Sequence, residues 1–140
     1  MAKHSKFYDT VREETFYSRE EIRALISDDY IRGLVEGAGC FANMRDSRGD
    51  QVPGFVLKMH ARDKELVEAV GDHLGLPDRV YEYTHRDRHF SLLQIRHIGS
   101  LKNKIVPLFK DKLLGYKGAQ FKAWLEKYPF LKSLNHVNKP

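Results

Sequence analysis

Two segments of the sequence, 40–61 and 79–96, gather basic and hydrogen-bonding side chains. Lysine and arginine neutralise phosphate groups, and Arg, Gln and His also form hydrogen bonds with base edges in the major groove of DNA. The same composition is typical of the solvated face of an antiparallel sheet, so both explanations stay open at this point. The candidate DNA-binding residues are Arg45, Arg48, Lys58, His60, Arg79, Tyr81, Tyr83, His85, Arg86, Arg88, Gln94 and Arg96.

A second stretch, YIRGLVEGAGCF at 30–41, carries a single acid, Glu36, directly before a Gly-Ala-Gly sequence. A carboxylate in the last turn of a helix is disfavoured by the helix dipole, which indicates a specific role for Glu36. One face of this helix holds two glycines, each of which costs about 0.5–1 kcal/mol relative to alanine. Close approach of another backbone, from the same domain or from a partner, would compensate. The residues of this face are Tyr30, Gly33, Leu34 and Gly37.

The elements that position these residues follow from the hydrophobic periodicity. Apolar residues at helical spacing and helix-capping residues predict five helical segments, whereas alternation with a period of two predicts two hairpins. Asp28 or Asp29 is expected to cap the second helix, and Pro107 to kink or break the fourth. Two hairpins with helices between and after them predict an α+β domain, with a four-stranded antiparallel sheet covered by helices on one face. The helical ranges are 18–27, 28–37, 62–75, 100–114 and 117–128, and the hairpins are 40–61 and 79–96.

Length and composition set the class of protein. The 140 residues suit one domain, 1–140, and 41% hydrophobic with 31% charged residues is ordinary for a globular protein. No apolar run approaches the roughly 20 residues of a membrane span, and the start of the chain lacks the apolar centre of a secretory signal. One cysteine, Cys40, makes neither an internal disulfide nor a zinc site by itself. An intracellular setting (cytoplasm, nucleoid or organelle) without a membrane partner is therefore expected, and the net charge of +5 is a weak indication of nucleic acid.

The stretch IRGLVEGAGCF at 31–41 resembles the LAGLIDADG motif of homing endonucleases. The downstream segments FVLKMHARDKELVEAVGDHLGL and LKNKIVPLFKDKLLGYKGAQFKAWLEK resemble the family's second strand with its helix and its last core helices, in the same order. The resemblance covers about residues 28–128. It implies an αββαββα fold whose saddle-shaped sheet lies over the DNA major groove, and metal-dependent cleavage of a long DNA site in intron or intein mobility.

The resemblance also gives the glycine face a purpose, because the family packs two motif helices against each other. A chain with one motif then implies a homodimer and a near-palindromic double-stranded DNA site. The implied dimer interface consists of Tyr30, Gly33, Leu34 and Gly37.

The implied metal site is incomplete. In the family, the acid at the eighth motif place ligates a divalent metal, normally Mg²⁺, beside the scissile phosphates, but here that place holds Ala38. Glu36 fills the sixth place, which mainly supports the helix end, and could reach a metal only if the turn rearranged. The Gly37 carbonyl, a lesser ligand in the family, remains. Metal binding is therefore expected to be weakened, and DNA cutting to be very poor or absent.

Two further positions match the family's catalytic pocket. Lys117, in GYKG, matches a basic residue near the scissile phosphate, although a solvated lysine at a helix start is the ordinary alternative. Met59 stands where many members have a polar residue that orders water, and its alternation suits a core residue instead.

Alternatives to an endonuclease remain at this stage. Ala38 is either a replacement of a Glu or Asp or the mark of a lineage that lost cleavage. On the same scaffold the chain could be a non-catalytic DNA-binding regulator or an intron-RNA maturase. An unrelated small α+β protein with a charged sheet face is the third hypothesis, and it predicts a monomer without salt-sensitive DNA binding.

Overall fold

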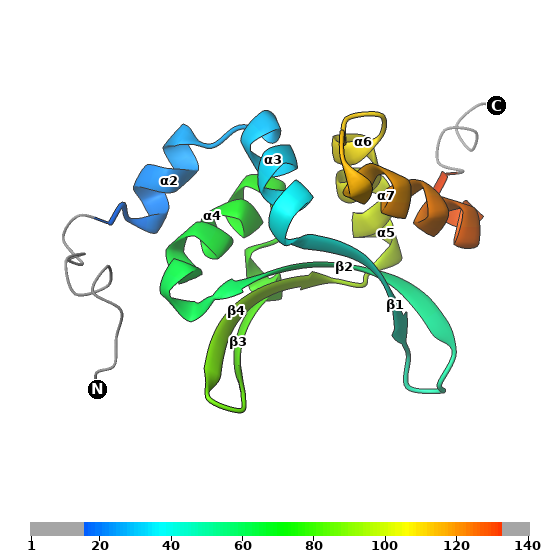
Figure 1. Ribbon diagram of the computed structural model, residues 1–140, viewed down its shortest axis with the longest axis horizontal. Helices are drawn as coiled ribbons and strands as arrows, with labels where there is room; N and C mark the ends of the chain where they lie inside the picture. Colours follow the sequence, from blue (N-terminus) through cyan, green and yellow to red (C-terminus); the bar gives the residue numbers. More distant parts are fainter. Residues whose placement is uncertain (1–15, 133–140) are drawn as a thin grey trace.

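A four-stranded antiparallel sheet forms the base of the molecule, with strand order β1-β2-β4-β3. The computed structural model describes residues 16–132, so the ends of the predicted domain, 1–15 and 133–140, lie outside the described residues. Figure 1 shows the helices on one side of the sheet, which arches so that its other side is concave and open. The predicted α+β fold is therefore confirmed. The strands are β1 (Gly39–Arg45), β2 (Gln51–His60), β3 (Val80–His85) and β4 (Arg88–Ile95).

The five predicted helical segments are present in the predicted order but differ in detail, and the fourth is divided into α5 and α6. Ser27, rather than Asp28 or Asp29, caps α3, because its side chain accepts the N–H of Tyr30. The predicted helix 100–114 is shorter and irregular, since a π-helical turn, Leu101–Ile105, separates α5 from α6 and the helix ends at Phe109. Pro107 lies just after that turn. The helices are α2 (Arg19–Leu25), α3 (Asp28–Ala38), α4 (Lys64–Leu74), α5 (Ile98–Ser100), α6 (Val106–Phe109) and α7 (Tyr116–Lys127).

An aromatic cluster joins the helical layer to the sheet. The Phe41 ring lies 5.5 Å from the rings of Phe55 and Phe109 and 4.9 Å from that of Phe121, measured between centroids. Such tilted and edge-on pairs each add about 0.5–1.5 kcal/mol to the free energy of burial. The cluster fixes the first hairpin under α6 and α7, which sets the position of the open face below.

The motif helix α3 is anchored by Ile31 and Val35, which are both completely buried. Residues four apart lie on one face of a helix, so this pair turns one side of α3 to the core. Glu36 and Arg32 contact other elements of the domain, and the side that carries Gly33 and Gly37 remains available for contacts outside it. No helix in the part of the chain described, 16–132, has the length and apolar character to cross a membrane.

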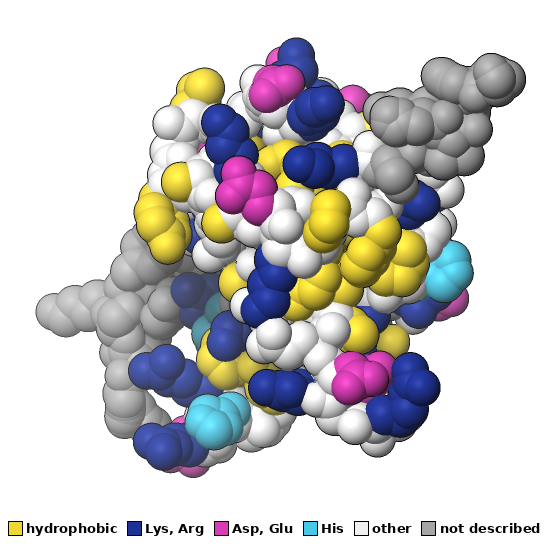
Figure 2. Space-filling view, turned by 90° about the vertical axis from the view of Figure 1, so that its right-hand side faces the viewer, with side chains coloured by type: hydrophobic (Ala, Val, Ile, Leu, Met, Phe, Trp, Pro, Cys, Tyr) yellow, Lys and Arg dark blue, Asp and Glu magenta, His cyan; other side chains and the backbone are white. Residues whose placement is uncertain are grey.

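Lys and Arg side chains form two groups on the side of the molecule that carries α7. Figure 2 shows one group over the helical layer at the top of the view and another over the hairpin ends at the bottom. Apolar side chains and a few further basic ones occupy the area between them.

Candidate nucleic-acid interface

The strand register decides which side chains reach the open face. In β2, Phe55 and Leu57 are buried in the core, so Val56 and Lys58 point to the opposite side. Lys58 pairs with Leu92 and Val56 with Gln94 across the β2–β4 ladder. Directly paired residues share a face, which places the alternate residues of β4 beside Lys58.

The register of β3, which the sequence left undecided, is now defined. Tyr81 pairs with Leu92 and Tyr83 with Phe90, so both tyrosines lie on the open face. Glu82 lies on the helical side, where its carboxylate is 3.0 Å from the Lys64 ammonium.

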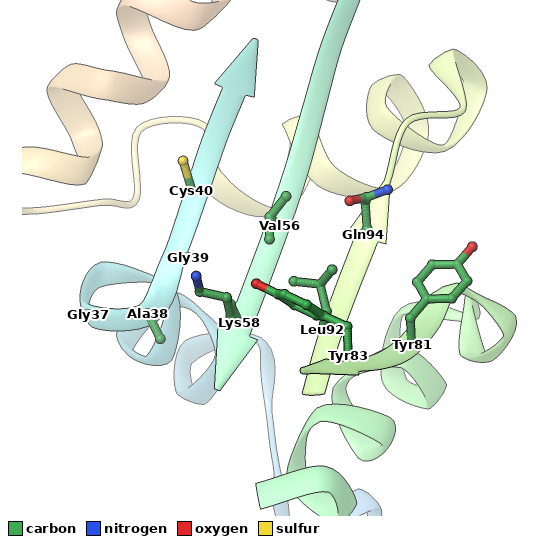
Figure 3. A pocket seen from close by; sticks show the side chains of 10 residues that line it. All are labelled: Gly37, Ala38, Gly39, Cys40, Val56, Lys58, Tyr81, Tyr83, Leu92 and Gln94. Atoms are coloured by element: carbon green, nitrogen blue, oxygen red, sulfur yellow. The ribbon is translucent and has the colours of Figure 1, made fainter. Parts of the chain in front are cut away.

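These strands and the foot of α3 enclose a shallow hollow of about 910 Å³. The Lys58 ammonium lies over the Phe90 ring, 4.6 Å from its centroid, which directs a positive charge along the face. Figure 3 shows the side chains that line this hollow. Among them, the polar ones of Lys58, Tyr81, Tyr83 and Gln94 belong to three neighbouring strands, β2, β3 and β4. The hollow is lined by Gly37, Ala38, Gly39, Cys40, Val56, Lys58, Tyr81, Tyr83, Leu92 and Gln94.

Several other predicted residues lie at the ends of the hairpins. His85 and Arg88 pair directly beside the two-residue turn, on the same face as Tyr83. Arg86 occupies that turn with φ of 60°, and Arg48 occupies the turn of the first hairpin, where it is 3.9 Å from Asp50. The turns of both hairpins therefore hold basic side chains, which lie at the two ends of the concave face.

His60 and Arg96 are more constrained than the sequence indicates. The Nδ1 atom of His60 accepts the N–H of Arg62 at 3.0 Å. Burial, and then the positive charge of Arg62, hold the pKa of His60 below its usual value, so its neutral form is favoured. Arg96 follows β4 and donates to the carbonyl of Arg45 at 2.7 Å, which ties the end of β4 to that of β1.

One predicted residue does not lie on the open face. The Tyr128 hydroxyl donates to Asn43 at 2.8 Å from the helical side, and Arg45, two residues later in β1, shares that side. The Arg45 guanidinium donates to the Gly49 carbonyl of its own turn, so its assignment to the open face is corrected. Arg79 lies in the 3₁₀ turn Pro77–Arg79 that precedes β3, with its Nε atom 3.9 Å from the Asp78 carboxylate.

The glycine face of α3 is open. A Cβ added at Gly33 or Gly37 would meet nothing within 4 Å, and Tyr30 is 48% exposed. Leu34 differs, because it is half-buried and packs against the core. No backbone among residues 16–132 approaches the two glycines, which excludes the explanation that they serve packing within this described part of the chain.

Gly39 explains why the helix ends so tightly. Its φ of −95° is accessible to any residue, but a Cβ there would lie 2.6 Å from the Val35 Cγ1 atom. The strand β1 therefore leaves directly over the buried side of α3, and only glycine leaves room for this exit.

Glu36 acts on another element. Its carboxylate accepts the N–H groups of Leu114 and Gly115, the latter at 3.2 Å. Gly115 is the N-cap of α7 and has no side chain with which to cap it. Glu36 therefore supplies from α3 the capping carboxylate that α7 lacks, which also favours the α7 dipole.

The foot of α3 does not fit a divalent cation. Ala38 offers no oxygen, Glu36 is engaged by two N–H groups and does not line the hollow, and only the Gly37 carbonyl remains. Across the described residues, no three His, Cys, Asp or Glu side chains are grouped as metal ligands. In this conformation Glu36 has a structural role, and its role as a metal ligand stays a prediction that requires the turn to rearrange.

Helix α7 runs along β1 and brings Lys117 toward the motif. Gln120 accepts the N–H of Phe41 at 2.8 Å, and the Trp124 indole donates to the carbonyl of Ala42 at 3.0 Å. The N–H of Gly115 binds Glu36 and Gln120 binds Phe41, so along the chain Lys117 lies between these two contacts of α7 with the motif and β1. It also lies about one turn before Gln120 on the same helix face.

Met59 is not part of the hollow. It lies on the side of β2 opposite Lys58, half-buried and packed against the core. The sequence analysis also missed Gln120 and Trp124. Gln120 and Trp124 are four residues apart, and this spacing predicts that both side chains lie on the same side of the helix, where their hydrogen-bonding groups can contact one neighbouring strand.

Comparisons with known proteins agree with this geometry. The family model described as LAGLIDADG endonuclease matches residues 31–128. A curated relative, the probable intron-encoded DNA endonuclease 1 of Mycosarcoma maydis, is 29% identical over 87 residues, which are 61% of this chain and 31% of that protein.

Solved structures share the fold. The meganuclease I-SmaMI bound to uncleavable DNA superposes with a TM-score of 0.65 at 21% identity, over 81% of this chain and 40% of its own. The homing endonuclease I-GzeII in complex with its DNA target gives a TM-score of 0.63 at 24% identity, over 82% and 40%. The chain spans less than half the length of these relatives. Because the family model covers most of the described residues, the chain belongs to the LAGLIDADG endonuclease family.

Proposed function

We propose that this chain binds a long, near-palindromic double-stranded DNA site as a homodimer, on a homing-endonuclease scaffold that no longer cuts. The observation that carries the proposal is the concave sheet face, to which the neighbouring strands β2, β3 and β4 contribute Lys58, Tyr83 and Gln94 on the same side of the sheet. Such a face fits the major groove, where lysine neutralises phosphates and amide groups bind base edges.

Two copies are proposed because the glycine face of α3 has no partner of its own. A Cβ at Gly33 or Gly37 meets nothing, so a second backbone has space to approach there. A twofold dimer presents the same face twice, which is why the site is expected to be near-palindromic.

Loss of cutting is proposed from the foot of α3. Mg²⁺ requires oxygen ligands, and a methyl group at Ala38 supplies none. The Glu36 carboxylate is already bound to Leu114 and Gly115. Binding of Mg²⁺ is therefore expected to be weak, while Lys117 retains its place beside the motif.

The test compares this chain with Ala38→Glu on a library of randomised palindromes, with and without Mg²⁺. Salt-sensitive selection of one site by both proteins, with cutting by Ala38→Glu alone, supports the proposal. Absence of salt-sensitive binding by either protein refutes it. Ala38→Gln is the matched control, because it has a similar size but no carboxylate.

A non-catalytic regulator or an intron-RNA maturase on this scaffold is the second candidate. Met59 favours it, because this residue, at the position where the family has a polar pocket residue, is half-buried and packs against the core. DNA binding by both proteins without cutting by Ala38→Glu would favour the regulator. Tighter binding of intron RNA than of DNA would favour the maturase.

A further inference from the structure

Positive charge is concentrated in the helical part of the chain that follows the sheet. Residues 98–132 contain eight lysines and no arginine, against the two acids Asp111 and Glu126, which gives this stretch a net charge of +6. The whole chain has a net charge of +5, so the remainder is slightly negative. The largest excess of charge therefore lies on α5–α7 and not on the hairpins.

Four of these lysines surround two adjoining hollows on α6, α7 and the following turn. Lys110 and Lys132 line both hollows, Lys122 lines the larger one of about 710 Å³, and Lys102 lines the smaller one of about 200 Å³. Leu125 also lines both. These four residues, Lys102, Lys110, Lys122 and Lys132, are called the lysine surface below.

The charge of the lysine surface is compensated only in part within the described residues. Asp111 and Glu126 also line the larger hollow. The ion pairs of residues 16–132 use other cations, such as Arg19 with Asp72, and none of them joins a lysine of the surface to either acid. Four lysines against two carboxylates leave a net positive field that attracts a polyanion.

The lysine surface lies apart from the concave face. Helices α6 and α7 are on the convex side of the sheet, whereas the open face curves beneath it (Figure 1). Figure 2 shows basic side chains over the helical layer at the top of the view as well as toward the hairpin ends at the bottom. A duplex that follows the arch does not reach the basic side chains of the helical layer.

We propose that the lysine surface is a second nucleic-acid-binding site, which holds the phosphodiester backbone of another nucleic-acid strand independently of the concave face. Lysine is a compact point charge on a flexible stem, so it suits phosphate without reading bases. Binding is therefore sequence-independent and strongly salt-dependent. If all four lysines neutralise phosphates, affinity falls about 100-fold between 50 and 200 mM salt, with a slope of about −3.6 for duplex DNA.

The experiment measures binding of a labelled random duplex DNA and of a labelled RNA hairpin to the full chain across a salt series. The variant Lys110→Gln/Lys122→Gln/Lys132→Gln removes three charges of the lysine surface, and Lys58→Gln removes one from the concave face. Acetylation of lysines, followed by mass spectrometry, reports which lysines each nucleic acid protects. Since the three substituted residues are exposed, an unchanged melting temperature is expected to confirm folding.

The expected result is three nucleic-acid molecules per homodimer, one shared by the two concave faces and one on each lysine surface, with protection of Lys110, Lys122 and Lys132. The triple variant should lose the binding event on each lysine surface and lower the salt slope by about three. Lys58→Gln should weaken only the other event, so failure of the concave site is distinguished from failure of this one. A single binding event with unprotected lysines, or an unchanged slope in the triple variant, overturns the proposal. The DNA and RNA arms show which backbone is preferred.

Discussion

Replacing Glu36 with alanine should destabilise the chain by removing the cap that α3 provides for α7. A hydrogen bond to a charged group contributes about 1.5–3 kcal/mol when it is protected from water, and loss of a helix N-cap costs about 0.5–2 kcal/mol. Both contacts, to Leu114 and Gly115, are exposed, so water replaces part of the loss. We expect a decrease of about 1–2 kcal/mol in the free energy of unfolding, or about 3–8 °C in Tm.

The assay is urea unfolding followed by fluorescence of Trp124, the single tryptophan, which is 3% exposed and sits on α7. Glu36→Gln keeps an acceptor but loses the charge, so it should fall between the parent and Glu36→Ala. Glu126→Ala, on the exposed side of α7, is the matched control and should change little. Equal stability of Glu36→Ala and the parent would refute the capping role, and so would a loss in Glu126→Ala as large as that in Glu36→Ala.

Three other predictions follow from separate contacts. Gly33→Leu should halve the mass measured by light scattering without unfolding the chain, because the added side chain occupies open space; an unchanged dimer mass would contradict the proposed interface. Lys58→Ala should lower the salt slope of DNA binding by about one unit, whereas Lys64→Ala, on the helical side, should not; equal slopes would remove Lys58 from the DNA face. Ser91→Ala should raise the free energy of unfolding by about 1 kcal/mol in urea titration, because the completely buried Ser91 hydroxyl has no hydrogen-bond partner; a loss of stability would show that the hydroxyl is satisfied.

The hairpins and the order of elements could be predicted because they depend on local periodicity. The change from helical spacing at Ile31 and Val35 to alternation at Phe55 and Leu57 is visible in the sequence and corresponds to the buried side of each element. The π-helical turn before Pro107 could not be predicted, since it depends on how the helix packs and not on its composition.

The site was predictable only in part, because it depends on register and on distant contacts. Strand alternation identified Lys58, but the side reached by Arg45 depends on the pairing around the turn, which composition does not define. The partners of Glu36 are 78 and 79 residues away, so the sequence indicated a role without revealing it.

The side-chain contacts along α7 have a consequence for self-association. An edge strand offers unpaired backbone groups to any other strand, which is a common route to aggregation. Gln120 occupies the N–H of Phe41, and Trp124 binds the carbonyl of Ala42, so α7 shields the β1 edge of the sheet. Pairing with another strand is therefore obstructed along this part of β1, whereas no such side-chain contact is present along the β3 edge among the described residues.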